Sequence, residues 1–128
     1  MHWKKAANLL SGYTTSTNIY AMKKKEYVLA KQLLRSGTSI GANLTEAQYA
    51  VSKKEFLVKA TISLKECAET EYWLDLLKET NLLSQTEYDS IIKDCKDLLH
   101  LLIATAKTTK QKINEKIKED IKVFIENN

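Results

Sequence analysis

Residues 33–56 read LLRSGTSIGANLTEAQYAVSKKEF, and this stretch decides the fold. Small or apolar side chains recur on one face when a helix that begins near Glu26 is continued through the stretch at about 100° per residue. They are Leu29, Leu33, Gly37, Ile40, Leu44 and Ala47. We predict that this face packs in the core of a helical protein.

A second stripe on the same helix contains polar side chains only. Its members are Arg35, Ser36, Ser39, Asn43 and Glu46. We predict that this helix lies at a subunit interface and that Arg35 and Glu46, with Asn43, belong to one polar network. Gly37 and Gly41 indicate either close packing against a neighbouring helix or a kink, since glycine costs about 1 kcal/mol relative to alanine within a helix.

Two serines mark the starts of the following helices. Ser52 precedes Glu55 by three residues, and Ser84 precedes Glu87 by three residues, which is the pattern of a capping box. After a turn near residue 51, the first box begins a helix that we predict to run to about residue 80, with Asn81 helping to end it. The second box begins a helix whose apolar period continues into the C-terminal segment.

The composition favours long helices in one domain. The 128 residues include 44% hydrophobic and 28% charged residues, three glycines and no proline, so short connections are expected. We predict a single all-α domain over residues 1–128, an up-down antiparallel four-helix bundle with residues 108–128 as a C-terminal helical extension. Residues 1–22 are the least regular part, because the run SGYTTST at 11–17 interrupts the expected first helix.

The expected compartment is the cytoplasm. No apolar run approaches the ~18 residues of a membrane-spanning helix, and the N-terminal residues lack a signal-peptide pattern, so no membrane partner is expected. An antiparallel hairpin that turns near residues 81–83 would bring Cys67 and Cys95 together. We predict two reduced core cysteines, as is usual in a cytoplasmic protein, and a disulfide or redox pair is the alternative.

The sequence offers little for catalysis or metal binding. Two cysteines cannot form a structural zinc site alone, and His2 and His100 are far apart in sequence. Asp97 and His100 have the spacing of half a di-iron carboxylate site, but the second half is missing. Three glutamates within residues 66–71 are mixed with lysines, which is typical of an exposed helix face. We expect no enzyme activity, no catalytic or cofactor-binding residues, and no metal.

Charge is distributed unevenly along the chain, whose formal net charge is +4. Residues 1–59 carry ten basic and three acidic groups, residues 60–100 carry four and nine, and residues 101–128 carry six and four. In an up-down bundle this predicts positive charge on the first two helices and the extension, and negative charge on the hairpin of the last two. Such a field favours a polyanion such as nucleic acid, or self-association of unlike faces. Solvated lysines without a partner are the alternative.

Residues 34–47 (LRSGTSIGANLTEA) and 52–56 (SKKEF) resemble the signature of a bacterial family of four-helix-bundle proteins encoded within intervening sequences of 23S rRNA genes. Seven positions match the family motif: Arg35, Ser36, Ser39, Asn43, Glu46, Lys54 and Phe56. The resemblance implies a ring-like homo-oligomer, commonly a pentamer, without known catalytic activity. It also implies a distant similarity to basic accessory proteins of diversity-generating retroelements, which bind nucleic acid and a reverse transcriptase.

These observations lead to two hypotheses of different kinds. The first is a non-enzymatic, oligomeric protein that binds RNA or DNA, associated with rRNA intervening sequences or a retroelement, through sequence-independent phosphate contacts. The lysines predicted to make these contacts are Lys4, Lys5, Lys23, Lys24, Lys25, Lys31, Lys53, Lys54 and Lys59. The second is a protein interaction scaffold, for example an accessory subunit that docks a reverse transcriptase.

Overall fold

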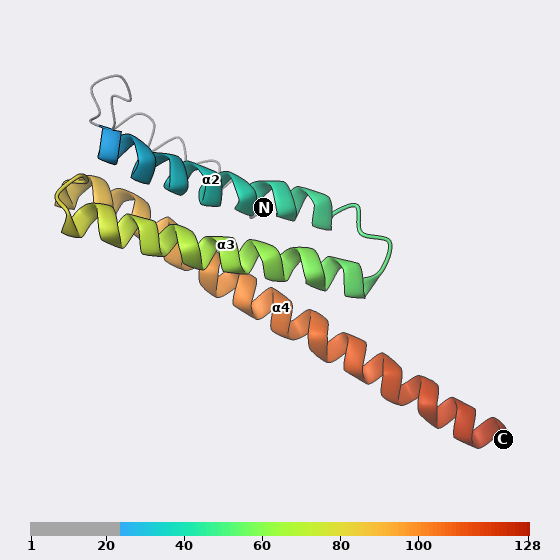
Figure 1. The fold of residues 1–128 in the computed structure, drawn as a ribbon. Helices are drawn as coiled ribbons and strands as arrows, with labels where there is room; N and C mark the ends of the chain where they lie inside the picture. Colours follow the sequence, from blue (N-terminus) through green and yellow to red (C-terminus); the bar gives the residue numbers. More distant parts are fainter. Residues whose placement is uncertain (1–23) are drawn as a thin grey trace.

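A computed structural model describes residues 24–128 of the chain, and the side chains of residues 27–128. Within this range the chain forms three helices and no strand: α2 (Lys24–Ala47), α3 (Lys53–Glu79) and α4 (Gln85–Asn127). Consecutive helices run antiparallel, and α4 continues beyond the other two (Figure 1). The all-helical prediction is confirmed. The fourth helix of the predicted bundle, expected within residues 1–22, lies outside the described residues.

Both predicted serine caps begin helices, but only one of them is a complete capping box. At α4, Ser84 accepts a hydrogen bond from the Glu87 N–H at 3.1 Å, and the Glu87 carboxylate accepts from the Ser84 N–H at 3.2 Å. At α3, Ser52 accepts from the Glu55 N–H at 3.1 Å, but the Glu55 carboxylate accepts from the Val51 N–H at 3.0 Å. Both arrangements satisfy N–H groups near the helix start that have no partner within the helix.

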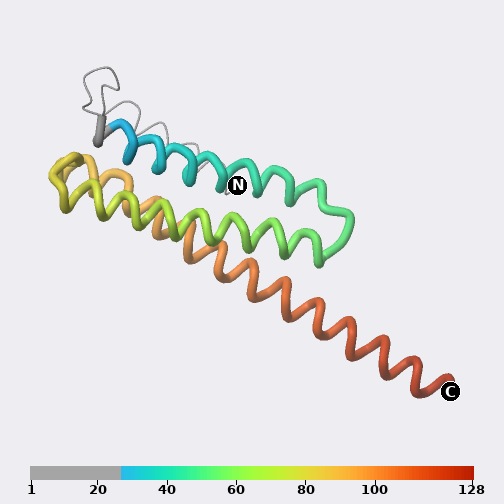
Figure 2. The backbone as a smooth tube through the Cα atoms, in the orientation of Figure 1, coloured from blue at the N-terminus to red at the C-terminus, as the bar shows by residue number. Residues whose placement is uncertain are grey.

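The turn between α3 and α4 forms where the sequence predicts it. Asn81 has a φ of 63°, in the left-handed region that asparagine tolerates better than most residues. The N–H groups of Leu82 and Leu83 donate to the Leu77 carbonyl at 2.8 and 3.0 Å, which satisfies the end of α3. From Gln85 the chain is helical without interruption to Asn127, so the predicted C-terminal extension is a continuation of α4 (Figure 2).

The core lies between the three helices, with α3 packing against both α2 and α4. Its fully or nearly fully buried side chains are Ala30, Leu33, Ile40, Leu44, Cys67, Leu74, Leu77, Leu83, Ile91, Ile92, Cys95, Leu98 and Leu102. The stripe predicted for α2 is therefore confirmed as the core face, with Leu29 partly buried at its start. α2 continues as one helix through Gly37 and Gly41, and Gly37 is buried, which supports the close-packing interpretation of the glycines.

Small hydroxyl side chains occupy the contact between α2 and α3. Thr70 on α3 donates to the Ser36 hydroxyl at 2.9 Å, and Ser36 in turn donates to the Leu33 carbonyl of its own helix at 3.2 Å. Ser63 donates across the contact to the Ile40 carbonyl at 3.1 Å. All three hydroxyls are buried and paired, and Thr70 also lies 2.8 Å from the Glu66 carbonyl of its own helix. An unpaired buried hydroxyl would cost about 1–3 kcal/mol.

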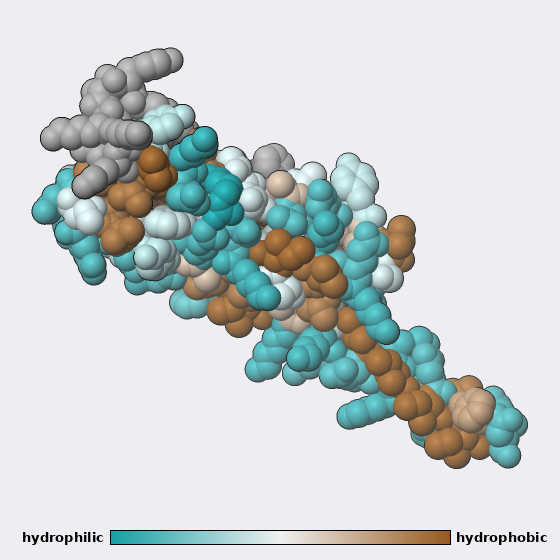
Figure 3. All heavy atoms as spheres, in the orientation of Figure 1, coloured by the Kyte–Doolittle hydropathy of each residue, from teal (hydrophilic) through white to brown (hydrophobic). Residues whose placement is uncertain are grey.

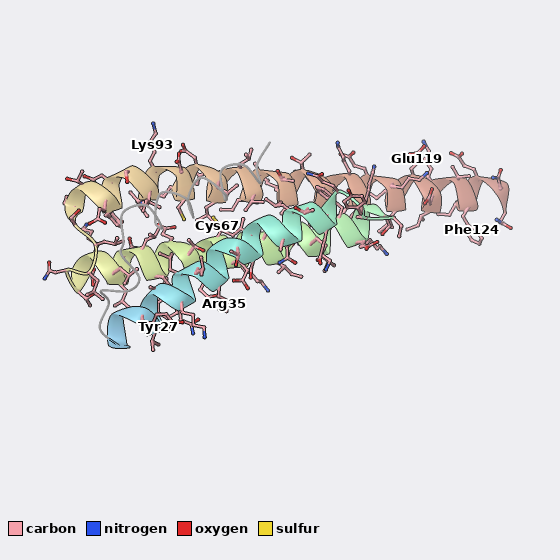
Figure 4. The ribbon with its side chains drawn as sticks, turned by 90° about the horizontal axis from the view of Figure 1, so that it is seen from above. Tyr27, Arg35, Cys67, Lys93, Glu119 and Phe124 are labelled. Atoms are coloured by element: carbon pink, nitrogen blue, oxygen red, sulfur yellow. The ribbon has the colours of Figure 1, made fainter. Side chains whose placement is uncertain are left out.

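The two cysteines face each other across the contact between α3 and α4. Cys67 lies on α3 in Figure 4. Both are free thiols with no exposed surface. Each thiol lies against the other residue's carbonyl oxygen, at 3.4 Å for Cys67 and 3.7 Å for Cys95. The hydrogen bond with Cys67 and burial raise the pKa of the Cys95 thiol, so this thiol stays protonated and poorly nucleophilic at neutral pH.

A second contact between α3 and α4 is polar and involves Tyr88 and Asp75. The Tyr88 hydroxyl donates to the Asp75 carboxylate at 2.5 Å, and the Lys78 ammonium lies 4.5 Å from the centre of the tyrosine ring. Burial and the bond to Asp75 raise the pKa of Tyr88 to about 12 from its usual value near 10.

The raised pKa of Tyr88 makes the hairpin sensitive to alkaline pH. The phenol ionises near pH 10 in the unfolded chain but only near pH 12 in the folded one, so its contribution to the free energy of unfolding is complete below pH 10 and is lost as the pH rises to 12. We expect Tyr88→Phe to show a shallower loss of stability over that window in urea denaturation at stepwise pH. Lysine titration is common to both proteins and cancels in the comparison. Parallel pH profiles would contradict the assignment.

Candidate nucleic-acid interface

Arg35 of the predicted polar stripe binds α3 of its own chain. Its guanidinium donates to the carboxylates of Glu69 and Glu66, the latter at 3.4 Å, and its Nε donates to Gln32 at 3.1 Å. The Glu69 carboxylate also accepts from the Trp73 indole N–H at 3.1 Å. These glutamates are therefore partly buried partners of Arg35, and the prediction of a plain exposed carboxylate face is wrong for them.

The other end of the stripe has a separate partner. Glu46 accepts from the Lys59 ammonium of α3 at 2.7 Å, while the Asn43 amide donates to the Ser39 carbonyl of α2 at 2.8 Å. Arg35 and Glu46 thus pair with different side chains, and the predicted single network is wrong within the chain. The motif residues of α2 mainly fix α2 on α3, and their role in assembly remains a prediction.

The predicted phosphate-binding lysines do not form one patch. Lys4, Lys5 and Lys23 lie outside the described residues, and for Lys24 and Lys25 only the backbone within α2 is described. Lys31 is exposed but lies about 24 Å along α2 from its end at Ala47, at 1.5 Å per residue.

The structure brings the remaining predicted lysines together at the α2–α3 turn. Lys53 and Lys54 are exposed in the first turn of α3. Lys59 lies less than two turns further along α3, where it is partly buried and paired with Glu46.

Phe56 of the family motif is the centre of this region. It is partly exposed and lines two adjoining open grooves. One groove, of about 370 Å³, is completed by α4 residues including Thr105, Thr109 and Lys112, and the other, of about 430 Å³, by the turn residues and Lys53. Lys112 was not among the predicted contacts. The only sequence signal for Lys112 is the apolar period that continues through α4. That period indicates that α4 packs along the whole of α3, so that Lys112 comes close to the start of α3.

Charge is separated along the axis of the bundle. Residues 45–62 and 104–128, which form the end around Phe56 and the extension, together carry nine lysines and six acidic residues. Residues 63–103, which form most of the α3–α4 hairpin, carry four lysines and nine acidic residues. The predicted net negative charge holds for α3 as a whole, but its first turns are basic and its later turns are acidic. We call this basic region, residues 45–62 and 104–128, the basic end.

The start of α3 adds a partial positive charge to the basic end. The N–H groups at the beginning of a helix are not all paired within it, and the helix dipole favours an anion there. Ser52 caps the Glu55 N–H, and the Glu55 carboxylate accepts from the Val51 N–H. In this first turn the two lysines, Lys53 and Lys54, outnumber the single Glu55 carboxylate. Phosphate groups are the anions that such an arrangement suits best.

Among the described residues, no group of three or more histidine, cysteine, aspartate or glutamate side chains is placed to hold a metal ion. Asp97 and His100 lie on exposed positions of α4. Within the same range, no helix is long and apolar enough to cross a membrane.

Comparison with known proteins identifies the family. The family model described as 23S rRNA-intervening sequence protein matches residues 1–104. A crystal structure from Bacteroides thetaiotaomicron, described as a protein with unknown function from the S23 ribosomal protein family, is similar with a TM-score of 0.75 and 40% identity, covering 84% of this chain and 99% of that chain. No curated protein matches significantly. The chain therefore belongs to the 23S rRNA-intervening sequence protein family.

Proposed function

We propose that this protein is a non-enzymatic, oligomeric bundle that binds RNA or DNA through its basic end. The observation that carries the proposal is the placement of Lys53 and Lys112 on the two grooves that share Phe56. These residues are 59 positions apart in the sequence, and the packing of α4 beside the start of α3 brings them to one surface. A polyanion laid across that surface would meet lysines from two helices.

The chemistry of this surface favours sequence-independent binding. Lysine ammonium groups and the start of α3 contact phosphates, which carry no base information. Two aromatic rings are available beside them, the partly exposed Phe56 and Tyr49, which is 80% exposed in the turn. Each ring can stack with an unpaired base, a contact worth roughly 1–3 kcal/mol, so single-stranded or looped nucleic acid should bind better than a duplex.

The salt dependence of binding tests the proposal. We expect the protein to bind a structured RNA or a single-stranded DNA at low salt, and the logarithm of the association constant to fall linearly with the logarithm of salt concentration, because bound lysines release counterions. Fluorescence anisotropy over a salt series measures the slope. A duplex of the same sequence serves as the comparison for stacking. Absence of binding to any of these probes at low salt would exclude this function.

Assembly into a homo-oligomer, with a pentamer favoured by the family resemblance, is part of the proposal. Apolar side chains on the outer side of α2 support it, because Tyr27, Val28 and Leu34 are 48%, 52% and 40% exposed. The polar stripe of α2 is engaged by α3 within the chain, so these apolar side chains are the part of α2 that a second copy would contact. Light scattering at increasing protein concentration measures the subunit number, and a monomer at high concentration would exclude α2 as an interface.

A protein interaction scaffold is the second candidate function. Exposed aliphatic side chains on the turn and on the outer side of α3 favour it, namely Val51, Val58 and Ile62, which are 93%, 57% and 36% exposed. Aliphatic side chains contribute to protein interfaces but contact phosphates poorly. Purification from the native host separates the two functions, because a scaffold retains a specific protein and a nucleic-acid-binding protein retains RNA or DNA.

A further inference from the structure

Cys67 and Cys95 form a pair of thiols that neither candidate function uses. They are the two cysteines of the chain, and neither has any exposed surface. Each sulfur lies against the carbonyl oxygen of the other residue, at 3.4 Å for Cys67 and 3.7 Å for Cys95. The two side chains are also hydrogen-bonded to each other. The thiols are therefore in direct contact in the core between α3 and α4.

The reciprocity of these contacts suits a disulfide bond. Each sulfur can touch the backbone of the opposite residue only where the two helices approach closely. Close approach of the two backbones is the first geometric requirement of a disulfide. Formation of a bond between Cys67 and Cys95 then needs rotation of two side chains rather than movement of the helices.

The pair lies in the packed part of the α3–α4 hairpin. Cys67 and Cys95 are 28 positions apart, so a bond between them would close a loop that contains the turn and both adjoining helix ends. Thr109 is the last buried residue of α4, and Figure 3 shows the end of this helix projecting beyond the body of the molecule. Packing therefore holds α4 on α3 through its earlier part alone, and a covalent link at Cys95 would fasten that part.

We propose that Cys67 and Cys95 are a redox pair, which hydrogen peroxide converts to an intramolecular disulfide that fastens α3 to α4. In the first step one sulfur attacks a peroxide oxygen as its thiolate and the O–O bond breaks. A sulfenic acid forms, and the departing hydroxide takes up the proton of the thiol as water. In the second step the other sulfur attacks the sulfenic sulfur and displaces its hydroxyl group as water. In total two thiols lose two electrons and two protons, and one peroxide is reduced to two waters.

Burial determines when this oxidation takes place. The hydrogen bond with Cys67 and burial raise the pKa of the Cys95 thiol, and both sulfurs are shielded from an oxidant, so the reaction requires the hairpin to open. Reclosure then places the unoxidised sulfur directly against the sulfenic acid and excludes further peroxide. The contact therefore favours the disulfide over the irreversible sulfinic acid. We expect slow oxidation to a single product, and faster oxidation in urea below the unfolding transition.

Mass spectrometry of the purified full chain tests the proposal, which does not depend on nucleic-acid binding or on assembly. The reduced chain is exposed to hydrogen peroxide, denatured, and treated with N-ethylmaleimide, which labels any remaining thiol. We expect both labels to be lost together, with a mass two hydrogens below that of the reduced chain, and dithiothreitol to restore both labels. The disulfide should raise the midpoint of thermal unfolding by several degrees, because the cross-link restricts the unfolded chain.

Single substitutions show whether the two sulfurs act together. In Cys67→Ala or Cys95→Ala the remaining thiol has no sulfur opposite it, so peroxide should give sulfinic acid or leave the thiol unchanged, and the midpoint should not rise. The oxidised and reduced forms of the unsubstituted chain are compared directly, so the test stands even where a substitution disturbs the core. Two unreacted thiols after prolonged exposure to peroxide would overturn the proposal. So would a disulfide between chains, sulfinic acid in the unsubstituted chain, or a disulfide that lowers the midpoint.

Discussion

Replacement of Ile40 by alanine is expected to lower the free energy of unfolding by about 2–5 kcal/mol. Ile40 has no exposed surface and lies on the core face of α2, where its carbonyl also accepts a hydrogen bond from the Ser63 hydroxyl of α3 at 3.1 Å. The substitution removes buried methylene and methyl groups and leaves a cavity that the close contact of α2 and α3 cannot fill. Because a domain of this size has only about 5–15 kcal/mol of stability, this single change approaches the threshold of unfolding.

Ile62→Ala is the matched control for this stability prediction. Ile62 is 36% exposed on the outer side of α3, so the same substitution there should cost well under half as much. Urea denaturation followed by circular dichroism measures both variants, and an unchanged dependence on urea concentration would show that the difference lies in stability. Equal losses in the two variants would contradict the core assignment of Ile40.

Reversing the charge of three lysines at the basic end is expected to reduce nucleic-acid affinity by a factor of roughly 100 to 1,000 at 0.1 M salt. Each phosphate contact contributes about 0.9 to the slope of the logarithm of the association constant against the logarithm of salt concentration. The variant is Lys53→Glu, Lys54→Glu and Lys112→Glu combined. The slope of log affinity against log salt should also become shallower by nearly three. All three side chains are exposed, so the fold should be retained, which circular dichroism checks.

The control for this reversal changes the same net charge elsewhere. Lys65, Lys93 and Lys96 are exposed on α3 and α4 outside the basic end, and their combined replacement by glutamate should reduce affinity much less. Equal losses in the two triple variants would mean that only net charge matters. In that case the surface around Phe56 is not the binding site.

Local chemistry explains why so much of the fold could be predicted. The α2 core stripe follows from helical periodicity, and the helix starts follow from serine caps with a glutamate three residues later. Even the facing thiols follow from an antiparallel hairpin with a short turn. The exception at Ser52, where Glu55 caps Val51 instead, reflects the local path of the turn, which sequence spacing does not specify.

The candidate site was less predictable, because it depends on contacts between distant residues. The sequence named Lys53 and Lys54 but missed Lys112, which joins them only through the packing of α4 beside Phe56. It also placed Arg35 and Glu46 in one network, although α3 supplies a different partner to each. Pairing between helices depends on their relative rotation and axial shift, and periodicity fixes neither.

The sequence by itself determined the three described helices, the core face of α2 and the serines that cap α3 and α4, because these follow from periodicity and short-range hydrogen bonding. Its motif residues also identified the family. Only the tertiary structure decided how charge is arranged along the bundle and which side chains meet. It also showed that residues 114–128 of α4 are exposed and lie beyond the core. The physical reason is that burial and electrostatic pairing depend on distances in space, and these are set when α3 packs between α2 and α4.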